Sequence, residues 1–315
     1  AALAAAVGVT PRFFELTTKG GVRPEQCHFR KQRTTPMSVI SQVLARGTLL
    51  DRFINALDRE LELPKVSFPD IQVTSLAEIE EAAEETRRVW KLGSGPISSM
   101  MRVVENAGAI VSFFSGVSER VDALSIDRPR PMIIRSEAKP AAVRLRFDLA
   151  HECGHLVMHR GIETGDKTTE SQANRFASAF LLPRSSFIHE FARGRLLNWQ
   201  AIFAMKLRWK VSAAAIVRRA FDLGIISADQ YRTGYIHLSK TGQKKVERYD
   251  DQITAEEPEL LQSAMAALDK AFPGAVRRLA AEAGLEAEMF CSVSGLKLPE
   301  PTTVHNSTVI DLFGR

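Results

Sequence analysis

Hydrophobic residues recur at helical spacing through much of the first third of the chain. Apolar side chains lie three and four residues apart across 38–63, which predicts one or two amphipathic helices. Ser75 begins an acidic helix that extends to about residue 89, and Glu78, three residues later, completes a capping box. A further helix is predicted for 97–106.

The pattern then changes to short apolar runs rich in β-forming residues. These runs predict a three-strand sheet, and they cover 109–114, 123–126 and 131–135. Pro140 in its first turn and Gly161 just past its end bracket a long helix, and a second helix over 168–182 stops before Pro183. The fold expected from this order is α+β and mostly helical.

Breaks at proline and glycine divide the chain into five regions. Region 36–93 is helical, region 94–195 holds the sheet and the two long helices, and region 196–249 holds two helices joined by a tight turn. The flanking regions are 1–35, which contains a glycine-rich basic linker, and 250–315, to which no role is assigned.

Charge is distributed unevenly along the chain. The formal net charge is +5, yet 184–248 alone contains thirteen Lys and Arg against four Asp and Glu. The three cysteines are far apart and odd in number, so they do not form a disulfide framework and favour a reducing, cytoplasmic setting. No apolar run approaches the ~20 residues that a transmembrane helix needs, so we expect no membrane association.

The strongest chemical signal is a His-Glu-x-x-His motif within the long 140–161 helix. At about 100° per residue, His151 and His155 lie about 40° apart and can bind one metal ion together. The opposite side of this helix is apolar and includes Cys153, which we interpret as a core residue. Glu152 flanks the imidazoles, where a carboxylate can act on a metal-activated water. The pattern predicts a catalytic zinc (Zn2+) site with an open coordination position.

A catalytic zinc site needs a third protein ligand, for which the sequence offers His159, Glu170 and His189. His159 lies one turn further along, about 80° from His151, and is too distant to share the ion. Glu170 is favoured because it opens the next helix, which can fold back antiparallel after a short loop. Asn174, four residues later on the same side, is then placed to hydrogen-bond a ligand imidazole. His189 is expected to be a surface or core histidine.

These residues also resemble a known family. The 146–159 segment Arg-Phe-Asp-Leu-Ala-His-Glu-Cys-Gly-His-Leu-Val-Met-His, followed by Glu170-x-x-Ala-Asn-x-Phe-Ala-x-x-Phe-Leu-Leu-Pro183, resembles the ImmA/IrrE metallo-endopeptidases. The resemblance implies a gluzincin-like fold, zinc ligation by His151, His155 and Glu170, and Glu152 as the catalytic base. It implies a cytosolic enzyme that cleaves or inactivates repressor-type transcription regulators. Residues 3–14 are similar to the tail of the Cro/C1-type helix-turn-helix that many members carry before the peptidase.

The basic 196–249 region resembles a helix-turn-helix, with Ser212 capping its second helix. The residues at the start of that helix are Val and Ala, which do not read bases. Five basic side chains are candidates for contacts with DNA phosphates: Lys206, Arg208, Lys210, Arg218 and Arg219. The alternative, which we slightly favour, is a helix pair that supports the peptidase and carries a solvated basic face.

Two functions therefore remain open from the sequence. The first is a zinc endopeptidase that hydrolyses a repressor-like protein, and the second is a DNA-binding transcription regulator that retains the zinc fold with little turnover. The residue that stabilises the oxyanion is not identified by spacing, and the candidates are Tyr231, Tyr235, His237 or an arginine.

Overall fold

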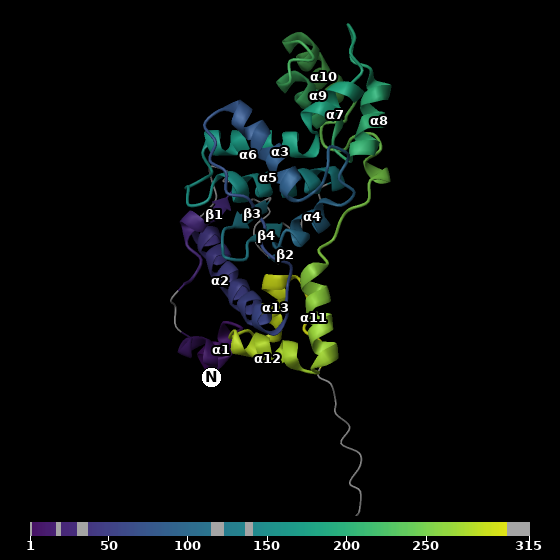
Figure 1. Ribbon diagram of the computed structural model, residues 1–315. Coiled ribbons are helices and arrows are strands. Elements are labelled where there is room, and N and C mark those ends of the chain that lie inside the picture. The colour runs from purple at the N-terminus through teal and green to yellow at the C-terminus, as the bar shows by residue number, and fades with distance from the viewer. Residues whose placement is uncertain (1, 17–19, 30–36, 115–122, 136–140, 301–315) are drawn as a thin grey trace, which may run out of the picture.

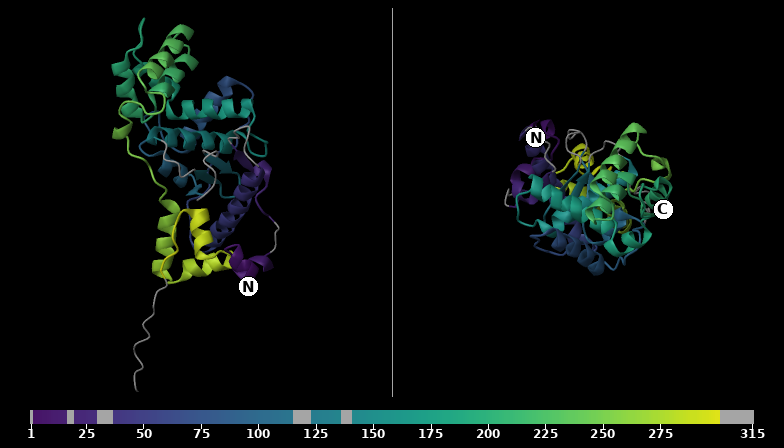
Figure 2. Two further views of the ribbon diagram at one scale, coloured as in Figure 1. Left: turned by 180° about the vertical axis from the view of Figure 1, so that it is seen from behind. Right: turned by 90° about the horizontal axis from the view of Figure 1, so that it is seen from above.

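The part of the chain that the structure describes is mostly helical and contains one small sheet (Figure 1). The computed structural model describes residues 2–16, 20–29, 37–114, 123–135 and 141–300. This architecture confirms the α+β expectation. The long axis extends from α10 (Ala228–Lys240) at one end to α12 (Ala275–Glu282) at the other (Figures 1 and 2).

The sheet has four strands where the sequence predicted three. Its strands are β1 (Cys27–Phe29), β2 (Ile110–Phe113), β3 (Ala123–Ile126) and β4 (Met132–Arg135), in the order β1-β3-β4-β2. β2 pairs parallel to β4, and the other two pairings are antiparallel. The additional strand β1 lies in the region interpreted as a linker, and its three residues are too few to produce a readable alternation.

The sheet separates two hydrophobic cores, because alternate residues of a strand face opposite sides. Val111 and Ile133 belong to the core on the side of the long helices. Ile110, Met132 and Ile126 face the second core on the other side. In Figure 1, α5 and α6 lie above the sheet and α2 lies below it.

The upper core holds the long helices and the basic helix pair. Its helices are α3 (Leu76–Val89), α4 (Met100–Asn106), α5 (Ala142–Met158), α6 (Lys167–Leu181), α7 (Arg184–Glu190), α8 (Trp199–Trp209), α9 (Ala213–Asp222) and α10. The expected caps form at Ser75 and Ser212, and Asp166 caps α6 by accepting from Thr168 and Thr169. Gly154 lets α6 approach α5 closely, since an added Cβ there would meet the Phe176 ring at 3.1 Å.

The lower core joins segments from both ends of the chain. It contains α2 (Met37–Glu60), α11 (Leu260–Ala271), α12 and α13 (Ala287–Ser294). The short helix α1 (Ala2–Ala6) lies beside α12, and Val9 forms a β-bridge with Leu285 (Figure 1). The predicted 36–93 region therefore splits, with α2 in the lower core and α3 in the upper one.

Partly buried polar contacts hold the segment that links the two cores. Glu256 accepts hydrogen bonds from Arg146, the Ser99 hydroxyl and the Met101 backbone N–H. Glu105 caps α11 by accepting from the backbone N–H of Leu260 at 2.9 Å. Within the described ranges, no helix is long and apolar enough to cross a lipid bilayer.

Candidate metal centre

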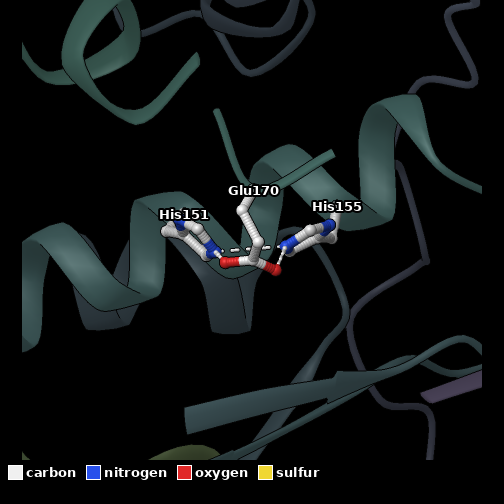
Figure 3. A group of neighbouring side chains, drawn as sticks. All are labelled: His151, His155 and Glu170. Carbon is white, nitrogen blue, oxygen red and sulfur yellow. Dashed lines mark hydrogen bonds and ion pairs between the residues drawn. The ribbon is translucent and has the colours of Figure 1, made fainter. Parts of the chain in front are cut away.

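Two histidines on α5 and a glutamate on α6 converge on one point (Figure 3). The Nε2 atoms of His151 and His155 lie 3.1 Å apart. Each lies 3.4 Å from a carboxylate oxygen of Glu170. The antiparallel return from α5 to α6 creates this arrangement, because it places the first turn of α6 over the imidazoles.

Hydrogen bonds at the far side of each ring determine where its proton lies. His151 Nδ1 donates to the Asn174 side-chain oxygen at 3.1 Å. His155 Nδ1 contacts His159 Nδ1 at 2.9 Å, and His159 Nε2 donates to the Gln172 side-chain oxygen at 2.9 Å. His159 Nδ1 must then accept, so His155 Nδ1 carries a proton. Both Nε2 atoms therefore present lone pairs to the shared point.

The three ligand atoms fit a tetrahedral cation. An ion bound tetrahedrally at about 2.0–2.1 Å separates its ligand atoms by about 3.3 Å, close to the observed 3.1 and 3.4 Å. Two neutral imidazoles with lone pairs this close repel each other unless a cation lies between them. Burial lowers the pKa of His155 to about 4, which keeps this ring neutral. The residues present therefore fit zinc.

Glu152 lies beside the three proposed ligands but is not one of them, because its carboxylate is hydrogen-bonded to the sheet. Its side chain is buried, and Ser125 Oγ on β3 donates to Glu152 Oε2 at 2.6 Å. Burial raises the pKa of Glu152 to about 7, although His151 and the Ser125 hydrogen bond act against that shift. A carboxylate with a pKa near neutrality is suited to exchange protons with a reacting group.

Three groups around the site were missed by the sequence reasoning. Ser125 interrupts an apolar strand, Leu-Ser-Ile, and that single polar position was a readable signal. Gln172 lies two residues after Glu170 and completes the chain of hydrogen bonds through His159. His28 on β1 stacks against His155, with ring centroids 5.2 Å apart and planes 7° apart. No pattern in the sequence indicated His28.

The other candidate ligands and oxyanion groups lie elsewhere. His159 caps the end of α5 beside the site and supports His155 without joining the ligand group. His189 is exposed on α7. The three candidate oxyanion residues Tyr231, Tyr235 and His237 all lie on α10. Tyr231 stacks on Phe221 and packs against Tyr235, and His237 stacks on Trp199. α10 packs against α9, so these three side chains are not part of the metal centre.

Two of the five candidate DNA contacts are buried, which corrects that expectation. Lys206 is fully buried and its Nζ donates to Glu247 at 2.7 Å and to Asp250 at 2.6 Å. Arg219 is also fully buried and forms a two-point ion pair with Glu80 on α3. Neither side chain can reach a phosphate.

The remaining three basic residues are accessible to different degrees. Arg208 and Arg218 keep side-chain exposures of 63% and 53%, and Lys210 Nζ donates to the Ser98 carbonyl. The start of α9, where a recognition helix would meet DNA, is covered by Glu247, which accepts from the backbone N–H groups of Ala213 and Ala214. An acidic group at this end repels phosphate, so the geometry favours a supporting helix pair.

Comparison with known families identifies the central part of the chain. Residues 104–221 match the family model of the IrrE N-terminal-like domain, a peptidase family. This segment is similar to an ImmA/IrrE-type peptidase. The match includes the sheet strands β2, β3 and β4, the His-Glu-x-x-His helix, Glu170 and the helix pair through α9. No curated protein matches the chain.

Proposed function

We propose that the protein is a zinc-dependent endopeptidase. One observation carries this proposal: two imidazole nitrogens and one carboxylate converge on a single point, with the buried Glu152 beside them. Three protein ligands leave a fourth position open, which is typical of catalytic zinc sites. The match to a peptidase family supports the same chemistry.

In this proposal His151, His155 and Glu170 hold the ion. Zinc, when bound, supplies Lewis acidity that polarises the scissile carbonyl and makes the attacking water more acidic. Glu152 accepts the proton of that water and passes it to the nitrogen of the leaving amine. Ser125 orients Glu152, while Asn174 and His159 fix the two imidazoles through their Nδ1 atoms.

The substrate that we propose is a repressor-type transcription regulator in the cytoplasm. The support is the family resemblance, since members of the ImmA/IrrE family cleave or inactivate such regulators. Fusion to a Cro/C1-type helix-turn-helix, expected from residues 3–14, stays a prediction.

The second candidate function is a DNA-binding regulator with a zinc site that turns over little. The excess positive charge of 184–248 favours it. Two observations argue against direct contacts between this region and DNA bases. Glu247 covers the start of α9, and Lys206 and Arg219 are buried.

One experiment separates the two functions. The zinc-loaded protein is incubated with purified helix-turn-helix repressors, and fragments are mapped by mass spectrometry. Wild type should cut a repressor, whereas Glu152→Gln should bind zinc equally and cut at least a hundredfold more slowly. Equal cleavage by both proteins would exclude Glu152 as the base. Zinc binding with DNA binding and no cleavage would favour the regulator.

A further inference from the structure

His28 places a histidine from outside the family match directly on the metal centre. It lies on β1, 76 residues before the matched segment 104–221 begins. Its partner in the strand register is Ser125 on β3, so both side chains leave the same face of the sheet. Ser125 bonds Glu152, and His28 stacks on His155. This face of the sheet therefore contacts both the predicted base and a predicted ligand.

One ring nitrogen of His28 has a fixed partner. His28 Nδ1 lies 3.1 Å from the Thr164 hydroxyl, and Thr164 belongs to the turn that joins α5 to α6. Stacking on His155 fixes the plane of the ring, while the hydrogen bond to Thr164 fixes its rotation within that plane. The two ring nitrogens point to nearly opposite sides, so this anchor directs Nε2 away from the Thr164 turn.

The other ring nitrogen, Nε2, is buried and finds no hydrogen-bond partner among the residues that the structure describes. The His28 side chain is 0% exposed. A buried polar atom without a partner costs free energy. A phenylalanine would stack on His155 without that cost. The presence of a nitrogen here therefore indicates a partner that arrives with a bound ligand.

The stacking indicates the side on which this partner lies. His28 packs face to face on His155, a member of the proposed ligand group, which places its ring beside that group. The ligand that fills the open position of a peptidase zinc site presents a carbonyl oxygen, which accepts a hydrogen bond. An imidazole with a proton on Nε2 can supply that bond.

We propose that His28 contacts the ligand of the metal centre, with Nε2–H donating a hydrogen bond to an oxygen of the bound peptide next to the ion. Thr164 donates its hydroxyl proton to His28 Nδ1 and so holds the tautomer that this role requires. His28 then fills the oxyanion-stabilising role for which α10 offers no residue at the site. This inference rests on the proposed peptidase function.

The test uses the full chain and acetohydroxamate, a small zinc-binding anion with two oxygens, as the probe. His28→Phe keeps the stacked ring and removes the nitrogen. Cys27→Ala is the matched control, because Cys27 is buried on the same strand but faces the lower core. Zinc affinity is measured by competition with a chelator, and acetohydroxamate affinity is measured on each zinc-loaded protein by calorimetry.

We expect His28→Phe to bind zinc within about threefold of wild type and acetohydroxamate about tenfold more weakly, as for one lost hydrogen bond. Cys27→Ala should match wild type in both. Unchanged acetohydroxamate affinity in His28→Phe would overturn the inference. A loss of zinc affinity as large as the loss of acetohydroxamate affinity would also overturn it, because that result indicates a structural role only. If His28→Phe does not fold, His28→Leu provides the same comparison.

The outcomes also separate this inference from the proposed function. A wild-type protein that binds no zinc, or whose zinc does not take acetohydroxamate, would overturn the proposed function and this inference with it. A wild-type protein that binds both, together with an unaffected His28→Phe, would overturn the role of His28 alone.

Discussion

Ser125 Oγ on β3 donates a 2.6 Å hydrogen bond to Glu152 Oε2 on α5, and both groups are buried. The bond connects the sheet to the carboxylate that we propose as the base. Ser125→Ala leaves that carboxylate oxygen without this partner, so we expect a loss of about 1–3 kcal/mol in the free energy of unfolding. Turnover should fall about tenfold.

Ser112→Ala is the control for Ser125→Ala. Ser112 is buried on β2 in the same sheet, and its hydroxyl donates to the Ser294 carbonyl in the lower core at 2.9 Å. This variant should lose stability in urea denaturation but keep the turnover of wild type. Equal effects of both variants on turnover would indicate that Ser125 acts through stability alone.

Zinc should stabilise the folded protein, because its ligand group exists only when α5 and α6 are packed together. At a zinc concentration about 1,000 times the Kd, the expected gain is about 4 kcal/mol. Thermal unfolding with zinc and with a chelator measures this gain. Glu170→Gln should lose most of it. A zinc-dependent shift of the same size in Glu170→Gln would mean that the ion binds elsewhere.

The hydrogen-bond chain from Gln172 through His159 should support zinc binding without ligating the ion. His159→Ala removes the acceptor of the His155 Nδ1 proton, so we expect zinc affinity to fall about 10–100-fold. His189→Ala, a change at the exposed histidine of α7, should leave the affinity unchanged. Chelator competition on both variants is the measurement.

The pH dependence of stability should reflect Glu80. Burial acts to raise the pKa of Glu80, but hydrogen bonds and charge from Arg219 and Arg175 outweigh it and hold the pKa below its usual value. The group therefore stabilises the fold above its unfolded pKa of about 4.3, and this stability is lost as the pH falls through the folded value.

Glu80→Gln tests this contribution. At pH 7 the variant leaves Arg219 buried without its carboxylate, so the expected loss is about 3–5 kcal/mol. Between pH 5 and 3 its stability should decline less steeply than that of wild type. Urea denaturation at several pH values measures both effects, and parallel curves would contradict the assignment to Glu80.

The buried charges of the basic helix pair, α8 and α9, should contribute more to the stability of the fold than to DNA binding. Lys206→Met leaves Glu247 and Asp250 without their buried partner, and we expect a loss of more than about 2 kcal/mol. Arg208→Met, at an exposed position on the same helix, should change stability by less than about 0.5 kcal/mol. Fluorescence anisotropy with duplex DNA should show no binding that depends on Arg208.

The sequence predicted the parts of the site that lie close together along two helices. His151 and His155 follow from the helical repeat, and Glu170 and Asn174 follow from an antiparallel return after a short turn. All four residues lie on two consecutive helices, so the helical repeat and the short connection between the helices contain the required information.

The missed parts depend on contacts between distant segments. His28 meets His155 across 127 residues of chain, and Lys206 meets Glu247 across 41. Some signal was present: Lys206 shares a helix face with Phe203 and Trp209, and Arg219 shares one with Ile216. A charge on an apolar face indicates a buried partner, but the sequence does not identify which carboxylate that is.

The two-sided sheet has a mechanical consequence for the whole molecule. Ile126 belongs to the lower core, to which α2 and the C-terminal helices contribute, while its neighbour Ser125 donates to Glu152 from the opposite face. A single peptide bond thus separates a side chain of the lower core from the one that hydrogen-bonds Glu152. We therefore expect a rearrangement of the lower core to move Ser125 and with it Glu152, so that this strand links the two halves of the protein.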